Sequence, residues 1–147
     1  MKKLLVCIGL LLGMHNVHAQ TYDVRCAMRK EDGKKVNEPA RFIYNKDKNV
    51  VIYSRMLRGE EMNLEFSPQK SHYENHGAML NKFMFNYKIR NNPQQFLFTI
   101  VTNKPIDTKI ADVEVSFNAA WVNVRPDGLA ENVYIDDFTS CKYTYFP

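Results

Sequence analysis

The sequence predicts an all-β domain, a single antiparallel β-sandwich or barrel of about eight to ten short strands with little helix. Apolar and polar side chains alternate with a period of two along most of residues 20–147. Turn-forming Gly, Pro, Asn and Asp residues interrupt this alternation at short intervals. Two cysteines, Cys26 and Cys141, lie near the two ends of this region on apolar faces, so we expect a disulfide that joins the terminal strands.

Residues 1–19 precede this domain and are typical of a cleavable secretory signal. Two lysines stand near the start, Leu4–Leu12 is an apolar run, and small or modest side chains lead up to Ala19. The run is shorter than the roughly 20 apolar residues that span a bilayer. We therefore expect cleavage after Ala19 and a periplasmic or secreted product, the single domain of residues 20–147, with no transmembrane segment.

The charge of the predicted product argues against a nucleic-acid partner. Of the 20 basic side chains in the chain, two leave with the signal, so 18 remain against 16 acidic ones and the net charge falls from +4 to +2. A nucleic-acid-binding domain would carry a denser basic face. We expect a weakly cationic, solvated surface.

The disulfide follows from the cysteine count and from the alternation. Cys7 leaves with the signal, which keeps Cys26 and Cys141 in the domain. Strand side chains alternate between faces, so Cys26 shares a face with Val24, and Cys141 shares one with Tyr143. Both sulfurs should therefore point to the apolar side. A bond that closes so long a loop contributes at most roughly 4–5 kcal/mol; the alternative is two buried, unpaired thiols.

The first half of the domain divides into strands at its turns. Asp32-Gly33 is a dipeptide typical of a tight hairpin. Asn45–Lys48 is a second polar turn, and Pro68 ends the last strand of this half. The predicted strands are residues 22–28, 41–44, 49–55 and 61–66.

Residues 67–81 are the least strand-like part of the domain, and we expect a long loop or one short helical turn. Loops of this length are often functional. His72, Tyr73 and His76 lie in this segment and are candidate partner contacts. Two histidines four residues apart on a helix could share a metal ion, but no third ligand lies nearby in the sequence. We therefore predict no metal site.

The second half begins with the clearest hairpin, in which residues 83–90 pair with residues 95–102 around the turn Asn91–Gln94. The return strand Phe96–Val101 is apolar on both faces, so it is predicted to be central and covered on both sides. Residues 121–125 either continue the strand before them or form another. The remaining strands are predicted at residues 113–117, 132–136 and 139–146, with Asp136-Asp137 as the turn between the last two.

Reactive motifs are missing from the sequence. No serine lies in a G-x-S-x-G setting, and the cysteines do not form a C-x-x-C pair. The acidic pairs Glu60-Glu61 and Asp136-Asp137 consist of neighbours, whose side chains face opposite ways on a strand. We expect neither enzymatic activity nor a cofactor.

Aromatic residues exceed what the interior alone requires, and aromatic anchors dominate protein interfaces. The favoured function is a non-catalytic protein-binding module, such as an inhibitor or immunity-type protein, with Trp121 as a further candidate contact. One alternative is a carrier of a small apolar ligand within a β-barrel. The least favoured alternative is an enzyme that acts on envelope polymers.

Processing and oxidation can be tested together. The protein recovered from its native compartment should have the intact mass of residues 20–147 with one disulfide, because the signal is removed and the remaining thiols are oxidised. Treatment with an alkylating agent before reduction should leave that mass unchanged. A product that keeps Met1 and is alkylated at both Cys26 and Cys141 would contradict the expectation.

Overall fold

The computed structural model describes residues 20–76, 80–102 and 109–147. The predicted signal, residues 1–19, lies outside the described residues. The described chain forms ten strands and contains no helix, which confirms the all-β prediction.

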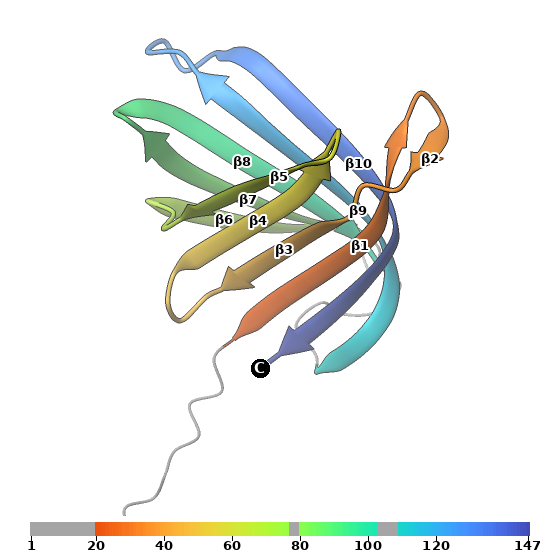
Figure 1. The fold of residues 1–147 in the computed structure, drawn as a ribbon. Coiled ribbons are helices and arrows are strands. Elements are labelled where there is room, and N and C mark those ends of the chain that lie inside the picture. The colour runs from red at the N-terminus through yellow and green to blue at the C-terminus, as the bar shows by residue number, and fades with distance from the viewer. Residues whose placement is uncertain (1–19, 77–79, 103–108) are drawn as a thin grey trace, which may run out of the picture.

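The strands form one antiparallel sheet (Figure 1). In chain order they are β1 (Thr21–Glu31), β2 (Lys34–Val36), β3 (Ala40–Asn45), β4 (Val50–Leu57), β5 (Glu60–Phe66), β6 (Lys70–His76), β7 (Leu80–Ile89), β8 (Asn92–Val101), β9 (Ile110–Val124) and β10 (Ala130–Phe146). Their order across the sheet is β5-β4-β3-β1-β10-β9-β8-β7-β6, and β2 pairs with β1. The first and last long strands, β1 and β10, are therefore central neighbours.

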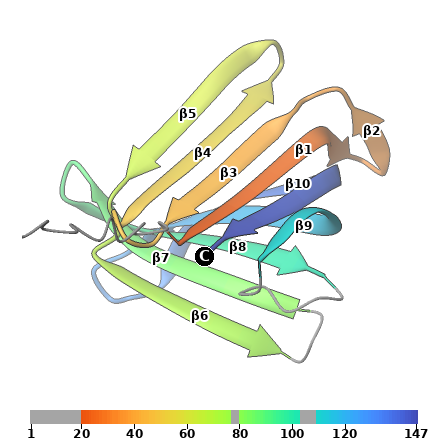
Figure 2. The same cartoon turned by 90° about the horizontal axis from the view of Figure 1, so that it is seen from below.

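The sheet curls into a half-barrel (Figures 1 and 2). Its two outer strands, β5 and β6, follow each other in the chain but do not pair with each other. Figure 2 shows them diverging from the turn that joins them. Of the sandwich and the barrel that the sequence left open, the structure has a single sheet that curves as a barrel does and stays open on one side.

The sequence predicted both hairpin turns, one at its observed position and the other slightly too late in the chain. Asp32 and Gly33 both have positive φ, at 49° and 75°, as a two-residue hairpin turn requires. The later hairpin turns at Arg90 and Asn91, with φ of 47° and 70°. That turn lies just before the position predicted for it, so β8 begins at Asn92.

Aromatic rings fill the concave face of the sheet. Phe42 on β3 is fully buried and lies 3.7 Å from Phe98 on β8, measured between ring centroids. Tyr44 on β3 meets Phe85 on β7 at 4.7 Å. Because β3 is not hydrogen-bonded to β7 or β8, these contacts join the two walls of the half-barrel directly.

The predicted disulfide is confirmed. Cys26 on β1 and Cys141 on β10 are directly opposite each other in the sheet and are bonded. Both are buried, on the face predicted for them. The bond joins residues 115 positions apart in the sequence.

The segment predicted as a loop or helical turn contains strand β6, so that prediction was wrong. β6 pairs with β7 from Lys70 opposite Asn86 to His76 opposite Leu80. As an outer strand it leaves several side chains exposed, and Tyr73, itself exposed, packs on Phe83. The apolar alternation that would have predicted a strand is therefore missing.

The strand Phe96–Val101 is covered on one face only, which corrects the prediction of cover on both. Phe96, Phe98 and Ile100 are buried, whereas Leu97 is half-buried and Val101 is exposed. The sheet is a single layer, and among the described residues no second layer covers its convex face.

The C-terminal region has two long strands, β9 and β10, in place of several short ones. The predicted turn at Asp136-Asp137 is wrong, because both residues lie within β10. Asp136 is buried on the concave face. Asp137 is exposed, and its Oδ2 lies 3.8 Å from Lys30 Nζ. The sequence predicts a turn here because a buried carboxylate in mid-strand is unusual.

Glu38 connects the chain before β3 to two neighbouring elements. Its carboxylate accepts hydrogen bonds from Arg29 Nε at 2.6 Å and from the backbone N–H of Arg58 at 2.8 Å. The Arg58 N–H, followed by the Arg29 guanidinium, lowers the pKa of Glu38 below its ordinary value of 4.5. The charged form of Glu38 is thus favoured by folding.

The contribution of the Glu38 carboxylate to stability should depend on pH. A carboxyl group whose pKa is lowered by folding stabilises the native state above its unfolded pKa, and this stabilisation is lost as pH falls through the folded value. Urea unfolding of Glu38→Gln should therefore show a smaller fall in stability from about pH 6 to about pH 3 than the wild-type protein shows. Parallel pH profiles for the two proteins would contradict this.

Candidate functional site

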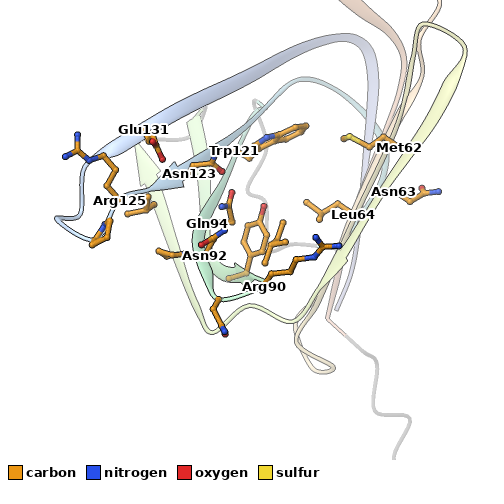
Figure 3. A pocket seen from close by; sticks show the side chains of 16 residues that line it. Met62, Asn63, Leu64, Arg90, Asn92, Gln94, Trp121, Asn123, Arg125 and Glu131 are labelled. Carbon is orange, nitrogen blue, oxygen red and sulfur yellow. The ribbon is translucent and has the colours of Figure 1, made fainter.

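A pocket of about 720 Å³ lies at one end of the half-barrel (Figure 3). Met62 and Leu64 line it from β5, Tyr87 and Gln94 from the β7–β8 hairpin, and Trp121 from β9. Figure 3 shows Met62, Leu64, Gln94 and Trp121 around the same space. The pocket is therefore bounded on one side by an outer strand of the sheet.

Alternation along β5 places its apolar side chains in the pocket. Met62 and Leu64 are half-buried on the concave face, while Asn63 between them is exposed and points away from the pocket in Figure 3. Phe66, on the same face, stacks on Tyr87 with ring centroids 4.1 Å apart. Burial raises the pKa of Tyr87 to about 12.

Trp121 is held between a cation and two other rings. The Arg55 guanidinium carbon lies 5.2 Å from the centre of the Trp121 ring, a cation–π contact. Tyr53 meets the indole at 6.2 Å and Tyr134 at 5.6 Å. The half-buried indole is thus oriented before anything binds.

A buried ion pair fixes Arg55 in turn. Asp136 on β10 pairs with the Arg55 guanidinium and accepts a hydrogen bond from the Tyr53 hydroxyl at 3.2 Å. The Arg55 and Asp136 side chains are only 10% and 9% exposed. Burial, followed by the charge of Asp136, raises the pKa of Tyr53 well above its ordinary range. Since β3 and β1 separate β4 from β10 in the sheet, these contacts cross the concave face.

Polar groups complete the pocket. Its polar lining residues include Gln94, Asn123, Arg90 and Glu131. Amide side chains both donate and accept hydrogen bonds, as peptide groups do. Across the described part of the chain, no cluster of three or more His, Cys, Asp or Glu could hold a metal ion. The arrangement is suited to recognition of a partly apolar, hydrogen-bonding ligand.

The four predicted contact residues do not form one site. Trp121 lines the pocket, whereas His72 lies on β6 and bonds to Glu74 at 3.1 Å. Tyr73 donates a hydrogen bond to Asn81 Oδ1 at 2.7 Å. For His76, which ends β6, the structure describes the backbone pairing only. Two strands, β7 and β8, separate β6 from β9, so Trp121 lines the pocket without the other three residues.

The residues that orient Trp121 were not identified from the sequence. Arg55 carried a usable signal, because it continues the inward alternation of Val51 and Tyr53 with a charged side chain. A charge at an inward position of a strand requires a partner. The partner, Asp136, is 81 residues away in the sequence, and no local pattern connects the two.

Comparison with protein-family models, with curated proteins and with solved structures found no match. Among the described residues we find no helix with the length and hydropathy of a membrane span.

Removal of the buried carboxylate should destabilise the fold. Asp136→Ala leaves Arg55 buried without its counter-charge, which typically costs about 3–5 kcal/mol. The neighbouring exposed pair Asp137–Lys30 is the control, because Asp137→Ala should change stability by less than about 1 kcal/mol. Urea unfolding followed by the fluorescence of Trp121, the one tryptophan in the chain, measures both. Equal effects of the two substitutions would contradict the role given to Asp136.

Proposed function

We propose that the protein is a non-catalytic, exported protein-binding module that holds an extended segment of its partner in the pocket beside β5. One observation carries the proposal: β5 is an outer strand, and its side chains Met62 and Leu64 line the pocket. An outer strand presents unpaired backbone N–H and C=O groups along its edge. Extended peptides bind such edges as an added strand, with pockets that select their alternate side chains.

The aromatic groups at the pocket support the same function. Trp121 and Tyr134 are of the residue types that dominate protein-binding hot spots, and Tyr134 is 51% exposed. Arg55 and Tyr53 already orient the indole. Less conformational entropy is then lost on binding, which favours affinity.

Export and inhibition are the finer parts of the proposal. The signal predicted in residues 1–19 and the Cys26–Cys141 disulfide both suit the oxidising environment of the periplasm or the cell exterior. We favour an inhibitor or immunity-type role within this class. A disulfide-linked sheet that captures a segment of another protein makes that segment inaccessible to its own substrates.

A small-ligand carrier is the second candidate, and the pocket volume is the observation that favours it. Ligand pockets typically measure about 300–1,000 Å³, and this one measures about 720 Å³. The deeper concave face is filled by buried rings such as Phe42, Phe96 and Phe98, so a ligand would occupy the pocket. Native mass spectrometry of gently purified protein with a bound hydrophobic molecule would favour this candidate.

Site-specific photo-crosslinking tests the protein-binding proposal. A photoreactive residue at Asn63, exposed on the edge strand, should yield a discrete protein adduct in the native host. The same residue at Lys142, exposed on central strand β10, is the matched control and should not yield that adduct. No adduct at position 63, or identical adducts at both positions, would count against the proposal.

A further inference from the structure

The two faces of β5 differ in chemistry. Met62 and Leu64 face the pocket, and Glu61, Asn63 and Glu65 are exposed on the opposite face. A strand added to this edge would place its own side chains on the same two faces, each opposite a β5 residue. The sequence of β5 therefore constrains the sequence of the added strand.

The acidic side chains of β5 are not neutralised within the sheet. Glu61 is opposite Met56 on β4, and Glu65 is opposite Ile52, so neither has a cross-strand charge partner. Neither glutamate forms an ion pair with another residue in the described part of the chain. Two carboxylates, four residues apart, thus remain available to a strand on the open side.

The same charges disfavour a second copy of this chain at the edge. An antiparallel pairing of two β5 strands centred on Asn63 would place Glu61 of each copy opposite Glu65 of the other. Like charges directly opposite each other destabilise a strand pair. Charged residues on outer strands are a common means of preventing such self-association.

We propose that the open edge of β5 binds an extended segment of another protein with the pattern basic–apolar–any–apolar–basic. The basic side chains lie opposite Glu61 and Glu65, and the apolar side chains lie opposite Met62 and Leu64 and enter the pocket towards Trp121. The pattern reads the same in both directions, so it holds for parallel and antiparallel addition. This inference rests on the proposed function and adds the chemistry of the partner.

The pocket suits the inward half of this pattern. The two apolar side chains would contact Met62, Leu64 and the Trp121 ring, which are available from two sides of the same space. Peptide groups of the segment would lie near the amides of Gln94 and Asn123, which can donate to a C=O and accept from an N–H. The basic side chains of the pattern, on the opposite face, would pair with Glu61 and Glu65.

Short capped peptides test the pattern, with Trp121 fluorescence as the readout. Acetyl-GKVTVKG-amide should bind and change the fluorescence of this one tryptophan. Acetyl-GEVTVEG-amide should bind about tenfold more weakly, because two attractive cross-strand pairs become repulsive. Acetyl-GVKTKVG-amide, with the same composition in another order, should bind more weakly than the first peptide, because no register places both lysines opposite the glutamates and both valines in the pocket. The preference for the lysine peptide should diminish as salt is added.

Charge reversal on the protein provides the matched variants. Glu61→Lys combined with Glu65→Lys should reverse the preference, so that the glutamate peptide binds more tightly. Both positions are exposed, so the variant should fold. Glu114→Lys, an exposed site on β9, should keep the original preference. Equal binding of the peptides, or an unchanged preference after reversal, would overturn the pattern; an Asn63 cross-link to a partner would then still support the proposed function.

Discussion

Ring packing across the concave face is the interaction on which the rest of the structure depends. β5 and β6 are unpaired with each other, so backbone hydrogen bonds do not close the sheet. Its curvature is maintained instead where rings from opposite walls meet, as Phe42 meets Phe98 and Tyr44 meets Phe85. Aromatic pairs of this kind contribute beyond the area that they bury. These rings set the separation of the two walls. They stop short of one end of the half-barrel, and the pocket lies at that end.

The Arg55–Asp136 pair lies where this apolar packing gives way to the pocket. Buried ion pairs carry a desolvation cost and are weak evidence of a gain in stability. Their geometric effect here is clear, because Asp136 fixes Arg55 and Arg55 contacts the Trp121 ring. The buried Arg55–Asp136 pair thus orients the half-buried Trp121 ring.

Sequence reasoning predicted features that depend on local alternation. The facing cysteines and the Asp32-Gly33 turn each require only a few neighbouring residues to be recognised. β6 was not recognised, because an outer strand with exposed side chains lacks the apolar period that marks a strand. The sequence identifies Trp121 as a candidate contact, but it does not predict the pocket that Trp121 lines. β5 and two hairpins meet at that pocket only after the sheet has curled.

The position of β1 and β10 has a consequence for biosynthesis. These are the first and last of the described strands, yet they form the middle of the sheet, so β10 joins two halves that are synthesised before it. Until β10 has emerged, β1–β5 and β6–β9 have no ladder between them, and Cys26 lacks its native partner Cys141. The facing edges of β1 and β9 therefore stay unpaired until β10 is available, which leaves the two halves prone to aggregation during synthesis.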